Sequence, residues 1–316
     1  MKRGIVVLYL SLFLLFLFCI SAGASQYTDE QLKHFANRDV IKEYRMASAK
    51  ALMIRYWKDG KTVEEWEKLV KSSNKTLQLA AAPYLAEAYK TREVPGKIEE
   101  AENLVKKLEN KISDENQYIR KAAGMALGDL YGIFCLYEKE GYREEDLIKV
   151  LKGKSSKELK SAARKAIVYV YAQNNNLDQI EKMYKENIHN LGEDLFISAY
   201  ALRLSSPLEP RVEPEKLKSM TENQELPSWI RSACGEAYGH IASDLNKEKL
   251  EEYALDSDNI YLSRGAGEAF SRSLINSDIT AKELIKTIVA SAGYKPRPYR
   301  KALENALAII FAKSGV

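Results

Sequence analysis

The chain has 316 residues, of which 46% are hydrophobic and 29% are charged, and its formal net charge is +4 at neutral pH. Loss of Lys2 and Arg3 would leave 46 basic against 44 acidic side chains. So balanced a chain has no surface built to neutralise many phosphates, and we expect no nucleic-acid partner.

The first 24 residues have the pattern of a secretory leader. A basic start precedes an apolar run over residues 5–20, and Ala22-Gly-Ala24 follows. This order predicts a signal peptide cleaved between Ala24 and Ser25. The alternative is a membrane anchor formed by residues 5–20, because the run approaches the length of a bilayer span. We therefore expect an exported protein, periplasmic, envelope-bound or secreted, with no membrane contact beyond this segment.

Within residues 25–316 one short sequence motif, here called the phrase, recurs at intervals of 32 to 42 residues. Each phrase has a central register residue, an apolar residue directly after it, and a small or apolar residue four positions before it. These offsets place the three on one face of a helix. The register residues are Ala51, Tyr84, Ala126, Ala166, Ala201, Ala237, Ala269 and Ala306. Eight phrases predict eight stacked helical hairpins in a single body, without strands.

A polar helix is expected before each phrase, for example over 63–70, 143–151 and 281–289. Capping boxes predict that several of these helices begin at Thr62, Ser155 and Thr280, each followed three residues later by Glu. A polar turn then leads to an Arg or Lys that opens the alanine-rich helix. The sequence therefore predicts a helix, a polar turn and a second helix in each unit.

The third phrase fits a known repeat pattern at Asp114, Ile119, Arg120, Ala122, Ala123, Ala126, Leu127 and Gly128. On these residues the chain, from about Asp39 onward, resembles the HEAT-repeat family of armadillo-like proteins. That resemblance implies an all-α, right-handed solenoid of about eight hairpins, whose second helices line a concave surface. Leu127-Gly-Asp-Leu-Tyr131 also looks like a tetratricopeptide repeat, the second choice. The proline-containing segment 205–214 predicts a loop between units, with a bend there as one interpretation.

The sequence shows no catalytic motif and no cofactor-binding loop. His34, His189 and His240 stand at no metal-ligand spacing from one another or from a cysteine, so we expect no metal and no cofactor. Cys135 and Cys234 lie three units apart, which predicts two free, buried thiols. We therefore expect a protein that is not an enzyme.

The column three positions after the register contains the candidate partner-binding residues. They are Glu87, Asp129, Tyr169, His240 and Arg272. We predict that they lie on the concave face and contact a protein or peptide partner, since a column of mixed charge suits such a partner better than a polyanion. Ordinary surface is the alternative interpretation of the column. The alternative function is an envelope enzyme or an accessory subunit with a pocket in the curve.

A second column, five positions after the register, holds Tyr56, Tyr89, Tyr131 and Tyr171. We expect an interior aromatic stack with each hydroxyl at the rim, and a ligand-binding stripe is the alternative. The last helix ends apolar over 306–312, whereas terminal repeats usually carry a polar outer face. This end therefore either docks onto something, including another copy, or is buried by the preceding unit.

Overall fold

The computed structural model describes residues 27–38, 41–92, 98–206, 212–242 and 245–313. Over these ranges the chain forms sixteen α-helices and no strand, which confirms the predicted all-α class. The predicted leader and the bond between Ala24 and Ser25 lie outside the described residues. Within the described part of the chain, no helix is both long and apolar enough to cross a membrane.

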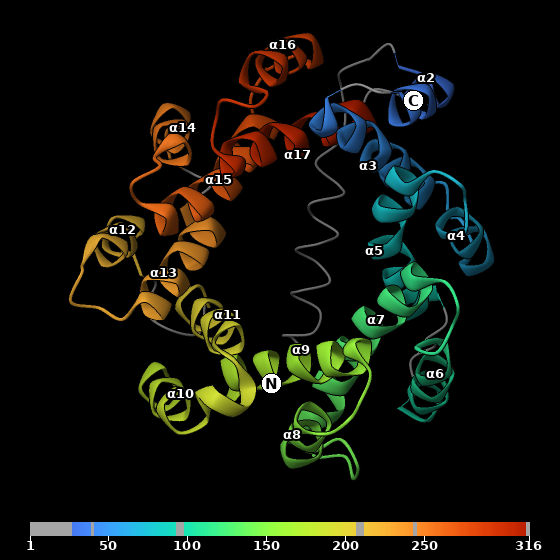
Figure 1. The fold of residues 1–316 in the computed structure, drawn as a ribbon, viewed down its shortest axis with the longest axis vertical. Helices are drawn as coiled ribbons and strands as arrows, with labels where there is room; N and C mark the ends of the chain where they lie inside the picture. The colour runs from blue at the N-terminus through green and yellow to red at the C-terminus, as the bar shows by residue number, and fades with distance from the viewer. Residues whose placement is uncertain (1–26, 39–40, 93–97, 207–211, 243–244, 314–316) are drawn as a thin grey trace.

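The helices form eight consecutive hairpins, each with an outer and an inner helix (Figure 1). The outer helices are α2 (Asp29–Asn37), α4 (Val63–Val70), α6 (Ile98–Lys111), α8 (Glu144–Lys152), α10 (Leu177–Leu191), α12 (Pro214–Glu222), α14 (Lys247–Leu255) and α16 (Ala281–Ser291). The inner helices are α3 (Lys42–Lys58), α5 (Lys75–Arg92), α7 (Gln117–Leu136), α9 (Lys157–Asn174), α11 (Glu193–Leu204), α13 (Ser228–Ile241), α15 (Ile260–Ile275) and α17 (Arg297–Lys313).

The hairpins close into a ring. Each inner helix packs on the next one in chain order, and α17 packs on α3 as extensively as neighbours within the chain do (Figure 1). The sequence analysis did not predict this closure, in which the first and last units cover each other. The apolar end of α17 therefore docks onto its own chain. The predicted bend falls partly on residues 207–211, outside the described residues, and α11 packs directly on α13 across it.

The predicted register holds in seven of the eight inner helices. The residue after the register position is at most 2% exposed in each: Leu52, Leu85, Leu127, Ile167, Tyr238, Phe270 and Leu307. In α11 the predicted register residue Ala201 is wrong. Leu202 after it is half-buried, whereas Leu195 and Tyr200 are buried. The register residue of α11 is therefore Ala199, two positions earlier.

Glycines bring some inner helices into backbone contact. A Cβ atom added to Gly265 of α15 would lie 1.8 Å from the carbonyl oxygen of Gly235 in α13. Gly239 of α13 faces the same residue, with its added Cβ 3.0 Å from the Gly265 oxygen. Only residues without a side chain permit this approach. The α13–α15 junction is thus a close contact between two helix backbones.

Tyrosines connect inner helices to outer ones. The predicted interior column is confirmed, because Tyr56, Tyr89, Tyr131 and Tyr171 are all less than 9% exposed. The hydroxyls of five buried tyrosines, three of them from this column, donate to carboxylates of outer helices. These hydrogen bonds are Tyr89 to Glu67 (2.8 Å), Tyr131 to Glu109 (2.7 Å), Tyr171 to Glu144 (2.9 Å), Tyr200 to Glu181 (3.0 Å) and Tyr299 to Glu251 (2.9 Å). The first four bonds each hold one hairpin together through a buried ring with a satisfied hydroxyl, and the fifth joins α17 to α14 of the preceding hairpin.

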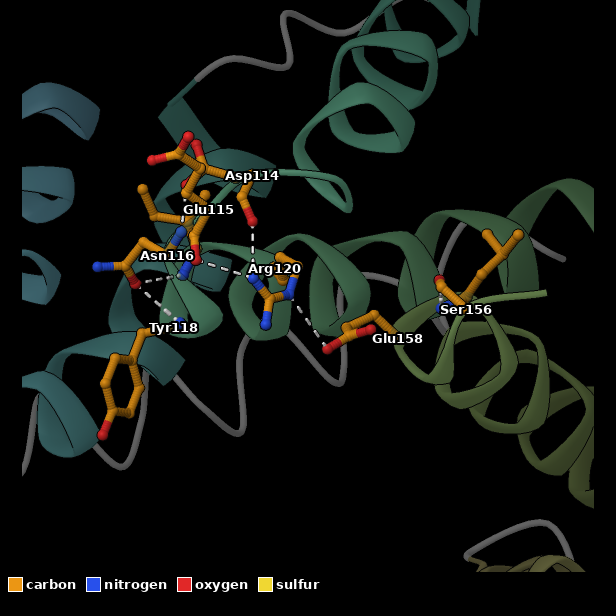
Figure 2. A network of polar contacts seen from close by, with 9 residues as sticks. Asp114, Glu115, Asn116, Tyr118, Arg120, Ser156 and Glu158 are labelled. Atoms are coloured by element: carbon orange, nitrogen blue, oxygen red, sulfur yellow. Dashed lines mark hydrogen bonds and ion pairs between the residues drawn. The ribbon is translucent and has the colours of Figure 1, made fainter.

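Arg120 shows why a basic residue opens the inner helix (Figure 2). Its Nη1 donates to the carbonyls of Asp114 (2.7 Å) and Glu115 (2.9 Å) in its own turn, and its Nε lies 3.7 Å from Glu158 of the next unit. The predicted capping boxes at Thr62 and Thr280 are confirmed. The one at Ser155 is wrong, because Ser156 caps α9 and leaves Glu158 to Arg120.

Candidate protein-interaction surface

The inner face of the ring is formed by one stripe of each inner helix. On the helical wheel, the position before the register lies about 160° from the position after it, which is buried against the outer helix. The two positions therefore face opposite ways. The inner stripe consists of the positions one and five before the register, which are one helical turn apart. Its exposed residues include Leu79, Pro83, Lys121, Lys165, Arg264, Glu268 and Lys301. Their exposure shows that solvent reaches this face.

All five predicted partner-binding residues are half-buried on inner helices. They do not converge on one point. Glu87 and Asp129 lie on α5 and α7, while His240 and Arg272 lie on α13 and α15, at the opposite side of the ring (Figure 1). Tyr169 of α9 packs beside Gly132 of α7, whose added Cβ would lie 3.3 Å from the Tyr169 ring.

A continuous chain of ion pairs runs over α5, α7 and α9. Lys90 lies 2.6 Å from both Glu87 and Asp129, and Lys165 lies 2.6 Å from the other oxygen of Asp129. Burial alone would lower the pKa of Lys90, but Asp129 and Glu87 outweigh it and raise that pKa. The two acidic residues that we predicted to be open to a partner are therefore already paired with lysines.

The α13–α15 side of the inner face carries a second polar group, which we call the Glu236 sector: Glu236, His240, Arg264, Glu268 and Arg272. Arg272 donates to Glu268 at 3.0 Å, and burial raises the pKa of the Glu236 carboxyl. Nearby Glu268 adds to that rise, while His240, Ser198 and Arg264 oppose it. Both charge signs thus occur together here as well.

His240 is held by a serine of the preceding inner helix. The Ser205 hydroxyl lies 3.0 Å from Nδ1 of His240 and also 2.9 Å from the carbonyl of Ala201. The same hydroxyl also lies 3.3 Å from the carbonyl of Leu202, and the direction of its bond to Nδ1 follows the tautomer of the imidazole. Ser205 therefore helps to hold the imidazole ring in place.

The sequence analysis missed three charged members of this surface. Lys165, Glu236 and Glu268 stand one position before the register, four residues before the column that we examined. Positions four apart share a helix face, so the column at offset minus one was available from the same repeat. That column would have shown Glu236 beside His240 and Glu268 beside Arg272, one turn earlier on the same helix.

Other chemistry-bearing residues give no second site of this kind. Cys135 and Cys234 are free and buried, as predicted. In the described ranges, no group of three or more His, Cys, Asp or Glu is arranged to hold a metal ion. A cleft of about 510 Å³ lies between α10 and the start of α13, lined by the stacked rings of Tyr184 and Trp229. Trp229 is only 4% exposed, so its ring serves the packing of these helices.

Comparison with known proteins assigns no relative. Neither the protein families nor the curated proteins gave a match. Among solved structures, one engineered protein shares 16% identity over 92% of this chain and 82% of its own, with a TM-score of 0.28. Another shares 17% identity over 80% of this chain and 98% of its own, with a TM-score of 0.19. Likeness at this level carries no argument about fold family or function.

Proposed function

We propose that this protein is an exported, non-catalytic binding module that holds a protein or peptide partner on the inner face of its ring. The observation that carries the proposal is the inner face itself. It is the place where exposed charged side chains of both signs gather on rigid helices, while the column on the other side of each helix is apolar and buried. Rigid elements position recognition groups well.

The charge pattern favours a partner of mixed polarity. Glu87 and Asp129 are compensated by lysines, and Arg272 is compensated by Glu268. A surface compensated in this way has no extended field of one sign, so it does not attract a polyanion over long range. Peptide segments, which carry both signs and many backbone donors and acceptors, suit such a surface.

Export and repeat type belong to this proposal too. The basic start, apolar run and Ala-Gly-Ala end of the first 24 residues support a leader removed after Ala24, and hence a site of action in the cell envelope or outside. The phrase around Arg120 supports a HEAT-like repeat, and Arg120 makes the turn and inter-unit contacts that would explain the recurrence of a basic residue there.

Photo-crosslinking in the native envelope tests the proposal. A photoreactive residue is placed at Lys165 or Glu268 on the inner face, or at Lys182, which is 78% exposed on the outer helix α10 and serves as the matched control. We expect adducts with the same partner from both inner positions, identified by mass spectrometry, and none from position 182. Adducts that form equally well from position 182, or no adducts at all, would contradict it.

One observation favours the alternative, an envelope enzyme or accessory subunit. Glu236 combines a raised pKa with the neighbouring imidazole of His240, and such pairs are candidates for acid–base chemistry. Thermal-shift screening against metal ions and small polar ligands tests this candidate. Stabilisation that disappears in Glu236→Gln but persists in Glu248→Gln, an exposed position on α14, would favour the enzyme.

A further inference from the structure

The junction between α17 and α3, here called the seam, follows the same plan as junctions within the chain. At three junctions the arginine six residues before the register of one inner helix contacts the residue eight before the register of the next. The three pairs are Arg120 with Glu158, Arg231 with the ring of Tyr261, and Arg300 with Glu43. The last pair joins α17 to α3. The ring therefore closes with the repeat's own head-to-tail contact and not with a specialised cap.

The seam differs in one position from three of the internal junctions, those formed by α7 with α9, α13 with α15 and α15 with α17. Two residues before the register, Gly124, Gly235 and Gly267 lie against the next inner helix, where an added Cβ would be 2.1 to 3.0 Å from a backbone oxygen. At the seam this position is Glu304. Its carboxylate pairs with Lys50 of α3 at 2.8 Å and with Lys301 at 2.7 Å. A buried carboxylate thus replaces the glycine contact.

Buried charge is concentrated at the seam. Among the described residues, the charged residues that are less than 9% exposed as a whole are Glu43, Arg55 and Glu304, and all three belong to α3 or α17. When an ionised group leaves such a junction it regains water, which offsets part of the interaction lost. Among the described residues, the seam is therefore the inner junction at which buried charges would regain water on opening.

Chain connectivity also singles out the seam. Every other pair of neighbouring hairpins is joined by the chain itself, whereas the first and the last are not consecutive. The seam can therefore open without unfolding a hairpin. Opening exposes one flank of α17 and one flank of α3, and these two surfaces are complementary to each other.

We propose that the seam is an interaction surface for a second copy of this chain, with α17 of one copy packing on α3 of the other. Two open rings joined in this way form both seams between chains and bury the same groups as the closed monomer. Such heterologous contacts close into a dimer or continue into a chain of copies. The closed monomer dominates while the protein concentration stays below the effective concentration within one chain, which is on the order of millimolar.

Charge exchange across the seam tests the proposal. Lys50→Glu places a carboxylate against Glu304, and Glu304→Lys places an ammonium against Lys50, so each variant repels itself at its own seam. When the two variants are mixed, a heterodimer contains one seam with both charges exchanged and one wild-type seam. We expect each variant alone to stay monomeric in light scattering, and the mixture to give on the order of tenfold more dimer.

An internal ion pair supplies the matched control. Asp129 of α7 and Lys165 of α9 lie 2.6 Å apart on consecutive inner helices of one chain. Joining two copies at their seams therefore does not bring Asp129 of one copy to Lys165 of the other. A mixture of Asp129→Lys with Lys165→Glu should therefore give no more dimer than either variant alone. A seam mixture that stays monomeric, or an internal mixture that dimerises equally, would overturn the proposal.

The wild-type protein gives an independent test, which needs no substitution and therefore does not depend on whether a variant folds. Unlabelled and ¹⁵N-labelled protein are mixed in urea, refolded at low or high concentration, and treated with a carbodiimide that joins Lys50 to Glu304. We expect links between labelled and unlabelled chains only in dimer formed at high concentration, and same-label links in the monomer. Dimer with same-label Lys50–Glu304 links alone, or no dimer at about millimolar protein, would overturn the proposal.

Discussion

Arg55 of the first inner helix donates a hydrogen bond of 2.6 Å to the carbonyl of Phe311 in the last turn of α17, 256 residues further along the chain. Carbonyls at the end of a helix lack partners within it and carry partial negative charge. Arg55 also donates to Asp29 at 2.8 Å, which fixes the guanidinium. The first hairpin thus completes the last helix.

Arg55→Ala is therefore expected to destabilise the protein. The substitution leaves the buried Phe311 carbonyl without this charged donor, and the free energy of unfolding should fall by about 2 to 3 kcal/mol. Urea denaturation followed by circular dichroism measures it. Lys149→Ala removes an exposed ion pair with Asp146 and should change the same quantity by less than about 0.5 kcal/mol. Equal losses in the two variants would show that Arg55 is not a special link.

Gly265→Ala tests the close approach of α13 and α15. The new methyl group would meet the Gly235 carbonyl at 1.8 Å, and because that atom belongs to a helix backbone, one helix has to shift. We expect a loss of about 3 kcal/mol or more in the free energy of unfolding.

Gly132→Ala is the matched control, because it is also a helical glycine at an inner junction. Its nearest neighbour is a side-chain atom of Tyr169 at 3.3 Å, which can move by a few tenths of an ångström. The gain in helix propensity is about 0.5 to 1 kcal/mol, so we expect little net change or a slight stabilisation. Similar thermal unfolding of the two variants would rule out backbone contact at Gly265.

The repeat predicted most of the fold because the small and apolar residues of each phrase are those that pack against neighbouring helices. The exception in α11 has a physical cause. Ala199 and Ala201 are both fully buried, so composition alone does not distinguish them. The hydrogen bond from Tyr200 to Glu181 on the outer helix distinguishes the two registers. A contact between two helices cannot be predicted from the sequence of either helix alone.

Ring closure was not predictable from the phrases for a different reason. Each junction contributes a small rotation, and whether eight rotations complete a circle depends on their sum. Arg300 is the basic residue that opens the phrase of the last helix, but its partner Glu43 lies at the other end of the chain. The arrangement of the candidate surface could not be predicted for the same reason. Glu87 and His240 lie on opposite sides of the ring only because the ring closes.

The two thiols should be unreactive in the folded protein. Burial raises the pKa of Cys135 to about 11 and that of Cys234 to about 12, so at neutral pH almost no nucleophilic thiolate forms. Titration with a disulfide reagent at pH 8 should detect neither thiol in native protein and both after denaturation. Rapid reaction of either thiol in the native protein would indicate an opening that exposes α7 or α13.

Glu236→Gln should stabilise the protein at neutral pH. Burial raises the pKa of this carboxyl above its unfolded value of about 4.3, so the folded state binds the proton more tightly than the unfolded state does. The stability due to Glu236 is complete below the unfolded pKa and is lost as the pH rises through the folded pKa. A neutral amide suffers no such loss. The advantage of the variant should therefore grow from about pH 4 upward and level off above the folded pKa.

Thermal unfolding of the wild type and Glu236→Gln between pH 3.5 and 8 measures this advantage. Glu248→Gln, at an exposed position, is the control and should give a small difference that changes little with pH. An advantage of Glu236→Gln that is independent of pH would mean that packing, not ionisation, separates the two proteins. A carboxylate that lowers stability at neutral pH and lies on the inner face is the kind of group expected where function, not folding, keeps a residue in place.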